Sequence, residues 1–431
     1  MSDLPIKTKK VAIFTTFLGV DMAYSLISVA SDQINMLKRK GYNPVVIVGK
    51  GFKPKGAFEG VELRNIPPVR LSNQGELLDN YQEEIKMMTD ALREILKDIE
   101  VCMTHDIIYQ PAHLIHNVAA RRIALERPDL KWLHWIHSAT SPSILCNKDE
   151  VRAEITRAFP NSFICYPNTF DIGRVAKNFG FEERHVKHVP HAIDLPEFYG
   201  FTDLSKEFVD KYNILGAEAI MVYPCRLDRG KQPQMNIKIM AALKRMGITV
   251  RLIIMDFHST GGDKVTYRNE LRSIHAARNG LTENEVIFTS EFKPETKSSC
   301  PRAMVRDMFL LANIYCHPSV SETYSLTTQE AAMCSNMIIL NYDFPPMRTI
   351  YEDYPLYYKF SSNIDMLSGE NGDTVTKYDN EKGYFNNIAM RILYEFRYNR
   401  ILALRNELRL KRNLDYVFRN YIEPLLYTEV E

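Results

Sequence analysis

The sequence lacks the charge excess and the long apolar runs that mark several common classes of protein. Its 54 lysines and arginines against 53 aspartates and glutamates leave a formal net charge of +1. This composition indicates neither a nucleic-acid-binding protein nor an acidic disordered chain, although a local basic patch could still be assembled. No apolar run approaches the roughly 18 residues that a membrane span requires. The opening MSDLPIKTKK leads directly into VAIFTTF and does not match a signal peptide.

Paired cysteines and nucleotide-binding fingerprints are missing as well. The seven cysteines are odd in number, scattered and mostly set in apolar runs, which is typical of buried thiols in a reducing compartment, and no CxxC pair could hold zinc. Neither GxGxxG nor GxxxxGK[ST] occurs in the sequence, so dinucleotide-dependent hydride transfer and P-loop ATP hydrolysis have no support. We therefore expect a soluble, cytoplasmic protein of another class.

The chain is organised as an alternation of short apolar segments and longer helical patterns. Its 431 residues are too many for one compact core and suggest two domains of about 200 residues each. KKVAIFTTF, SLISVASDQINMLKRKG and YNPVVIVG form a β-α-β unit, and the pattern restarts at AEAIMVYPCRL. We expect an α/β protein with two Rossmann-like doubly wound domains, 1–200 and 201–431, facing each other across a cleft. A helical tail from about 384 should cross back onto the first domain.

Residues just past strand ends are candidate ligand-binding residues, because open α/β sheets bind ligands outside the carboxyl ends of their strands. VYPCRLDRGKQP, 222–233, places Arg226 at a strand end and Lys231 five residues later, in a turn with Gly230. Arginine offers a fork of donors and lysine a point charge, so together they suit a diphosphate. The alternative is a solvated turn with surface charges.

The second strand end is HPSVSETYSLTTQEAA, where a turn of hydroxyl residues leads into a helix. Backbone N–H groups at this helix start, at Ser325 and Leu326, form a natural seat for a phosphate. Glu322 lies in the turn, and Glu330 lies one to two turns into the helix. A carboxylate accepts hydrogen bonds in pairs, which suits vicinal hydroxyls of a sugar or ribose. The alternative is that both glutamates have only helix-terminal and solvent-facing roles.

Histidines suggest two further hypotheses. HVKHVPH places His185, His188 and His191 at intervals of three, which resembles a metal site. Neighbours three apart in a strand point to opposite faces, so only His185 and His191 would share a side, and metal binding is disfavoured. His137 follows the strand-like KWLHWI and is either a ligand-facing histidine or a structural one.

These motifs together resemble a known family. PSVSETYSLTTQEAA resembles the Glu-seven-residues-Glu signature of retaining, GT-B-fold glycosyltransferases of family 4, and CRLDRGK resembles that family's Gly-Arg-Leu…Lys-Gly loop. HVPHAIDLPEF resembles the segment that ends the family's first domain, and TTFLGVDMAYSLISVASDQINMLKRKGYNPVVIV is similar to its first β-α-β unit. The motifs occur in the family's order, and the resemblance covers most of the chain. Some short segments of the sequence are similar to those of viral-type members of the family.

The resemblance implies roles for particular residues. Arg226 and Lys231 would bind the donor diphosphate, Glu330 the ribose, and Glu322 hydroxyls of the transferred sugar. The donor would also contact Ser325 and Leu326 at the helix start, and Gly19 after the first strand. His137 would face the sugar and, with Glu322, form the catalytic set.

The sequence also departs from the family pattern. LGVDMAYS stands where relatives often have paired glycines, Tyr324-Ser325 where Phe-Gly is usual, and Ser335 where a glycine follows the helix. His191-Ala192 replaces Asn-Gly. None of these changes removes a charged group from the expected site. The departures themselves indicate a divergent branch of the family.

The expected activity is sugar transfer from a nucleotide-diphosphate sugar to an acceptor hydroxyl, with retention and without a metal or other cofactor. No DxD-type ligand cluster stands at a plausible strand end. A saccharide or glycan is the favoured acceptor, a hydroxymethylated DNA base is the next, and peripheral membrane contact stays open. Alternatives are a nucleotide-sugar epimerase or glycosyl phosphorylase on the same scaffold, and a non-catalytic binding protein with this fold.

Overall fold

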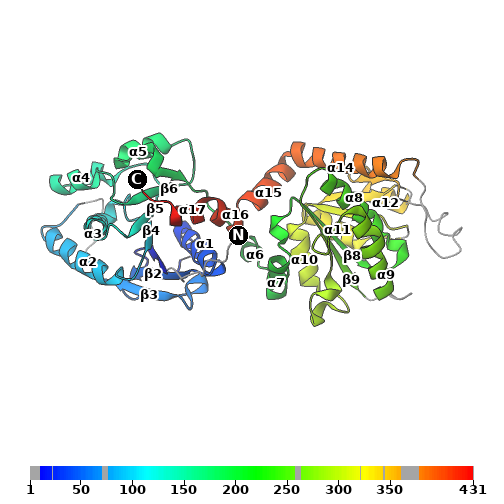
Figure 1. Cartoon of the computed structure of the whole chain (residues 1–431), viewed down its shortest axis with the longest axis horizontal. Coiled ribbons are helices and arrows are strands. Elements are labelled where there is room, and N and C mark those ends of the chain that lie inside the picture. Colours follow the sequence, from blue (N-terminus) through cyan, green and yellow to red (C-terminus); the bar gives the residue numbers. More distant parts are fainter. Residues whose placement is uncertain are drawn as a thin grey trace. The chain divides into compact units, whose positions relative to one another are not determined.

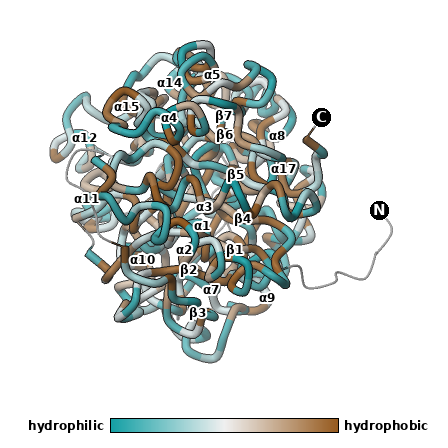
Figure 2. The backbone as a smooth tube through the Cα atoms, turned by 90° about the vertical axis from the view of Figure 1, so that its left-hand side faces the viewer, coloured by the Kyte–Doolittle hydropathy of each residue, from teal (hydrophilic) through white to brown (hydrophobic). Residues whose placement is uncertain are grey.

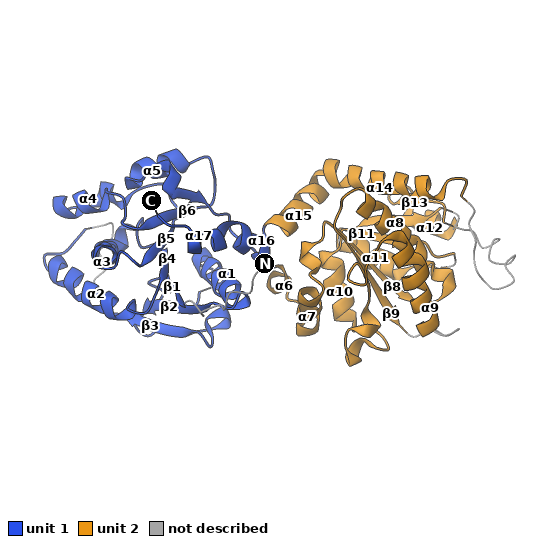
Figure 3. Ribbon diagram, in the orientation of Figure 1, with its two compact units in different colours: residues 1–194, 412–431 blue, residues 195–411 orange. Residues whose placement is uncertain are grey.

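The computed structural model describes residues 10–21, 23–69, 76–257, 264–320, 322–342, 345–360 and 378–430. By internal packing the chain divides into two compact units, residues 1–194 with 412–431 and residues 195–411 (Figure 3). Among the described helices, none has the length and apolar composition needed to cross a bilayer.

The first unit is built on a parallel sheet of seven strands in the order β3-β2-β1-β4-β5-β6-β7. Its strands are β1 Lys10–Phe14, β2 Asn43–Gly49, β3 Glu62–Ile66, β4 Val101–His105, β5 Lys131–Trp135, β6 Ser162–Tyr166 and β7 Val186–His188. Its helices are α1 Ser25–Arg39, α2 Tyr81–Ile95, α3 Leu114–Glu126, α4 Asp149–Ile155, α5 Ile172–Phe179, α16 Leu414–Val417 and α17 Glu423–Tyr427. The strand order is that of a doubly wound Rossmann-like sheet.

Side-chain alternation along the strands gives this sheet two buried faces. Ala12 and Phe14 of β1 pack in one core with residues of α2 and α3. Val11 and Ile13 pack in the other core with α1 and the C-terminal segment. Because successive strand residues point to opposite faces, a strand covered on both sides must be apolar throughout. This explains why VAIF is continuous rather than alternating.

The second unit repeats the plan with a parallel sheet of six strands in the order β10-β9-β8-β11-β12-β13. Its strands are β8 Ala219–Arg226, β9 Val250–Phe257, β10 Val286–Phe288, β11 Ile314–His317, β12 Met337–Asn341 and β13 Leu356–Tyr358. Its helices are α6 Leu195–Phe198, α7 Asp203–Lys211, α8 Pro233–Arg245, α9 Lys264–Glu270, α10 Arg302–Leu311, α11 Leu326–Met333, α12 Pro345–Tyr351, α14 Glu381–Tyr398 and α15 Arg400–Lys411. The expectation of two Rossmann-like α/β domains is confirmed (Figure 1).

The C-terminal segment packs on the first unit, as expected for a tail that crosses back. In Figure 1 the red α17 lies beside β5 and α1, and Leu425 and Leu426 belong to the core that contains Leu133 and Trp135. The Lys131 ammonium donates to the Leu425 carbonyl at 3.3 Å, and the Tyr42 and Tyr427 hydroxyls are 2.6 Å apart. Hydrophobic and hydrophilic stretches alternate along the backbone (Figure 2), which is typical of helices that cover a core.

The unit boundaries differ in two places from the expected domains 1–200 and 201–431. Phe201 lies in the core of the second unit and Leu195 packs against it, so the second unit begins at residue 195. Phe418 and Ile422 are buried against the first sheet, so residues 412–431 belong to the first unit. In both places the burial of apolar side chains, rather than the order of residues along the chain, determines to which unit a segment belongs.

Candidate functional site

The candidate site lies at the carboxyl edge of the second sheet, where two neighbouring strands end. β8 ends at Arg226 and β11 ends at His317, and the two strands are adjacent in the sheet. The loop after β8 contains Lys231, and the loop after β11 contains Glu322. Parallel strands end on one edge, so both sequence motifs come together there.

Lys231 and Glu322 form the central contact of this site. The Lys231 ammonium donates to Glu322 Oε2 at 2.6 Å, and the two side chains are 15% and 24% exposed. Contact with the His317 imidazole, and then with the Lys231 ammonium, lowers the pKa of Glu322 to about 2. The carboxylate is therefore ionised at neutral pH and lies beside a cation. This geometry joins residues that are 91 positions apart in the chain.

The two loops are tied together by backbone-directed hydrogen bonds. The Tyr223 hydroxyl donates to the Lys231 carbonyl at 2.6 Å, and Gln232 Nε2 donates to the Pro318 carbonyl at 2.7 Å. The Val320 amide donates to the Gly230 carbonyl at 3.0 Å. Because each bond restricts a different part of the loops, the Lys231 side chain emerges from a fixed backbone. Such support is what a site needs to hold charges in place before a ligand binds.

His317 is a site residue that the sequence motifs did not identify. It is buried, and its Nε2 lies 3.6 Å from Glu322 Oε2. Its Nδ1 lies 3.1 Å from the Tyr315 hydroxyl, which in turn lies 2.7 Å from Thr327 Oγ1. Burial lowers the pKa of His317, so the ring is neutral at pH 7. A proton on Nε2 would point at Glu322 if the Tyr315 hydroxyl donates to Nδ1, which makes His317 a positioning residue for Glu322.

The residue before α11 has an unusual backbone conformation. Ser325, immediately before the helix, has a left-handed backbone with φ 60°, and the Tyr351 hydroxyl donates to its carbonyl at 3.0 Å. Its hydroxyl lies 2.8 Å from Thr328 Oγ1. Leu326 is the first helical residue and its side chain is 63% exposed. The first backbone N–H groups of a helix have no partner within the helix and attract anions.

The left-handed backbone at Ser325 leads to a prediction about stability. Glycine adopts this conformation without steric cost, whereas alanine keeps the Cβ that disfavours it. Ser325→Gly and Ser325→Ala both remove the hydroxyl, so their difference isolates the backbone effect. We expect the glycine variant to be more stable than the alanine variant by about 1 kcal/mol, measured by urea unfolding. Equal stabilities would show that Ser325 does not require this conformation in solution.

Arg226 and Glu330 belong to the same edge but have other partners. Arg226 is the last residue of β8, and its Nε lies 3.5 Å from Asp228 Oδ2. Glu330 lies within α11 and pairs at 2.5 Å with Arg302, whose side chain is 86% exposed. Exposed ion pairs of this kind contribute little to stability, so the pairing leaves the Glu330 carboxylate open to competition from a ligand. Their roles toward a ligand stay predictions.

Two sequence-predicted residues lie in the first unit. His137 follows β5, and its ring stacks on His191 with centroids 5.1 Å apart. Burial, and then the nearby His191, lowers the pKa of His137 to about 4, so its imidazole is neutral at pH 7. Gly19 follows β1, and a Cβ added there would meet nothing within 4 Å. Sterics therefore do not require glycine at this position, and a ligand contact at Gly19 stays a prediction.

The three histidines at intervals of three have separate surroundings. His185 packs on Phe163, His188 packs on Tyr421, and His191 stacks on His137. Within the described ranges, no group of three or more histidine, cysteine, aspartate or glutamate side chains is arranged to hold a metal ion.

A second buried charge cluster adjoins the site at the end of β9. Asp256 is fully buried and accepts from the Ser290 amide at 3.0 Å and from the Ser290 hydroxyl at 2.7 Å. The Lys264 ammonium lies 3.2 Å from the same carboxylate. Asp256 pairs in register with Cys225, next to Arg226. The sequence signal for Asp256 is its position at the end of the apolar ITVRLIIMDF. None of the motifs described above includes this residue.

Comparison with known proteins gives matches among solved structures alone. No family model matches the sequence, and no curated protein matches it significantly. A glycosyltransferase from Rickettsia africae ESF-5 is 11% identical with a TM-score of 0.37, covering 97% of this chain and 98% of that one. Anabaena HepE in complex with UDP is 12% identical with a TM-score of 0.34, covering 97% and 99%. Sucrose-phosphate synthase from Thermosynechococcus elongatus is 14% identical with a TM-score of 0.33, covering 95% and 96%. At this level of similarity the matches say nothing about activity.

Proposed function

We propose that the chain is a retaining, family 4-type glycosyltransferase of GT-B architecture, which transfers a sugar from a nucleotide-diphosphate sugar to an acceptor hydroxyl. One observation supports this most directly. Lys231 and Glu322, from the two family-like motifs, meet at 2.6 Å on the carboxyl edge of the second sheet. Lys231 lies in the loop after β8, and Glu322 lies in the loop that leads into α11. A cation, a carboxylate and a helix start side by side suit a ligand that combines phosphate with hydroxyl groups.

Each part of the site has a chemical role in this proposal. Lys231, Arg226 and the N–H groups at Leu326 bind the diphosphate and stabilise the charge that grows on it as it departs. Glu322 accepts hydrogen bonds from hydroxyls of the transferred sugar, and Glu330 accepts them from the ribose. These groups supply the positive potential that a divalent cation supplies elsewhere, so we propose that no metal is required.

The transfer step exchanges one bond at the anomeric carbon for another. The bond between this carbon and the diphosphate oxygen breaks with its electron pair passing to the diphosphate, and the acceptor oxygen forms a bond on the same face. The acceptor proton passes to the departing diphosphate oxygen, so no separate protein base is needed. The role of His137 toward the sugar, which the family resemblance implies, stays a prediction. We propose a saccharide or glycan as acceptor, with hydroxymethylated DNA as the next candidate and membrane contact as a further context.

Nucleotide-sugar binding tests the proposal first. We expect one class among UDP-, GDP-, ADP- and dTDP-sugars to raise the melting temperature of the wild type without added metal, because the site binds the folded state alone. At a ligand concentration of 100 Kd the gain is about 2.7 kcal/mol. Glu330→Ala should lose most of this gain because the ribose loses its carboxylate partner. The measurement is a thermal-shift panel in the presence of EDTA.

Glu407→Ala is the matched control, since Glu407 is an exposed helical glutamate that pairs with Lys411 in the same unit. It should respond to the nucleotide sugar as the wild type does. A folded wild type that none of the four classes stabilises would rule out the transferase proposal and favour a non-catalytic binding protein. Turnover of a stabilising nucleotide sugar without any acceptor would favour an epimerase instead.

A further inference from the structure

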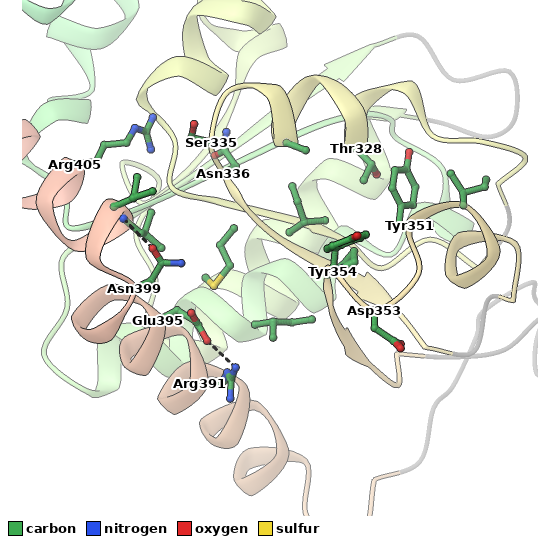
Figure 4. A pocket seen from close by; sticks show the side chains of 18 residues that line it. Thr328, Ser335, Asn336, Tyr351, Asp353, Tyr354, Arg391, Glu395, Asn399 and Arg405 are labelled. Carbon is green, nitrogen blue, oxygen red and sulfur yellow. Dashed lines mark hydrogen bonds and ion pairs between the residues drawn. The ribbon is translucent and has the colours of Figure 1, made fainter.

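The second unit contains a further cavity of about 630 Å3. It is lined where β12 and β13 begin, at Met337 and Leu356, and by α11, the α12–β13 turn and helices α14 and α15 (Figure 4). Its volume lies within the several hundred cubic ångströms that are typical of small-molecule sites. Lys231 and Glu322, the central pair of the candidate site, are not among its lining residues.

The charges that line this cavity balance. Arg391 and Arg405 are its cations, and Asp353 and Glu395 are its anions. Arg391 is paired with Glu395 at 2.7 Å, and Arg405 donates to the backbone carbonyl of Ala312 at 2.7 Å. With two cations and two anions, the lining carries no surplus charge toward a ligand. This arrangement disfavours a phosphorylated or otherwise charged ligand, whose desolvation would not be offset.

The rest of the lining combines apolar surface with planar polar groups. Tyr354 is 89% exposed and Ile401 is 79% exposed, although both line the cavity. In Figure 4, Tyr351 and Tyr354 lie on one side, and the Arg391–Glu395 pair and Asn399 lie on the other. A ligand between them meets aromatic rings on one wall and hydrogen-bonding groups on the opposite wall. Large exposed apolar side chains that gather at a cavity indicate a binding site.

We propose that this cavity is an accessory binding site for a neutral saccharide. A sugar ring offers apolar C–H faces to Tyr354 and Ile401, and it offers hydroxyls that both donate and accept to Glu395, Arg391 and Asn399. The choice of a saccharide over other neutral polar molecules rests on the proposed glycosyl transfer.

The accessory site adjoins the candidate donor site through Tyr351. This residue lines the cavity, and its hydroxyl donates to the carbonyls of Tyr324 and Ser325, each at 3.0 Å. Thr328 also lines the cavity and contacts the Ser325 hydroxyl. A saccharide in the cavity therefore touches the residues that hold the start of α11.

Direct titration of the full chain tests this site. The probes are glucose, mannose, galactose, maltose and lactose, each measured by calorimetry and by saturation-transfer NMR without nucleotide. We expect at least one of them to bind with a Kd of about 1 mM or tighter. Tyr354→Ala and Arg391→Ala should each weaken binding at least about tenfold, because one removes the aromatic face and the other a donor. Both side chains are exposed enough that folding should persist.

Two further variants separate this proposal from the proposed function. Tyr398→Ala is the matched control, since Tyr398 is an exposed tyrosine on α14 that does not line the cavity. Lys231→Ala should abolish nucleotide-sugar binding and leave saccharide binding unchanged. Saccharide binding that survives Tyr354→Ala and Arg391→Ala, or that is lost in Lys231→Ala, would overturn the accessory site. Failure of all five sugars to bind, or tighter binding of glucose 6-phosphate than of glucose, would also overturn it.

Discussion

Lys231→Ala is expected to lower kcat by about two to three orders of magnitude, because one preorganised donor to a developing anion contributes about 3–4 kcal/mol to the barrier. The Lys231 side chain is 15% exposed and its backbone is held by the Tyr223 hydroxyl. Its ammonium is therefore held in place before a ligand binds. The measurement is steady-state turnover with the nucleotide sugar that stabilises the wild type.

Lys238→Ala provides a closely matched control for this variant. Lys238 lies on α8 in the same unit, its side chain is 17% exposed, and it pairs with Glu381 at the same 2.6 Å. Each variant removes the lysine of one Lys–Glu pair, so both should lose a similar amount of stability. A difference in turnover between them therefore cannot be due to lost stability. We expect a large loss of turnover in Lys231→Ala alone. Near-wild-type turnover of Lys231→Ala would contradict the assignment of Lys231 to the diphosphate.

Glu322→Gln is expected to lower kcat/KM by about one to two orders of magnitude, because a hydrogen bond to a charged group contributes about 1.5–3 kcal/mol. The substitution keeps the shape of the side chain and removes the charge that faces Lys231. A uniform loss of ground-state binding would raise KM and leave kcat unchanged. A loss confined to kcat would indicate that Glu322 acts mainly in the transition state. Either split supports contact with the donor sugar.

Glu285→Gln is the control for this second variant, since Glu285 is 15% exposed and pairs with Lys244 at 2.7 Å, before β10 begins. It should leave kcat/KM unchanged. Stability offers a second readout, because the folded pKa of Glu322 lies near 2, below the ordinary value of 4.5. The ionised group therefore stabilises the fold above about pH 4.5, and this contribution is lost as the pH falls toward 2. The stability gap between wild type and Glu322→Gln should narrow over that interval, and a constant gap would argue against the Lys231–Glu322–His317 contact.

The strands with strong apolar patterns were predictable, whereas two of the edge strands, β3 and β13, were not. VAIFTTF, AEAIMVYPCRL and ITVRLIIMDF became β1, β8 and β9 because strands buried on both faces are apolar throughout. β3, with the sequence ELRNI, and β13, with only three residues, did not stand out. Edge strands are covered less and pair on one side, so their composition is under weaker constraint. A local pattern therefore did not reveal β3 and β13.

The candidate site residues also divide into those that the sequence predicts and those that it does not. Arg226, Lys231 and Glu322 could be proposed from the sequence because each lies at or after the end of a predicted strand. His317 was missed because its importance depends on Glu322 and Tyr315, which approach its two ring nitrogens from different directions. The long-range pairing of Lys231 with Glu322 was likewise not visible as a contact. Tyr324-Ser325 stands where Phe-Gly is usual in the family. The φ of 60° at Ser325 explains why a glycine would fit this position, because glycine adopts a left-handed backbone without steric cost.

The sequence by itself determined the class of fold, the two-part organisation and the loops in which charged residues follow buried strands. These features depend on local periodicity and on composition, which each segment displays without the rest of the chain. Only the tertiary structure decided which charges meet, which side chains line the accessory cavity, and at which residue, 412, the tail joins the first unit. Those outcomes depend on burial and on contacts between segments far apart in the chain, and the free energy of such contacts is set by three-dimensional packing.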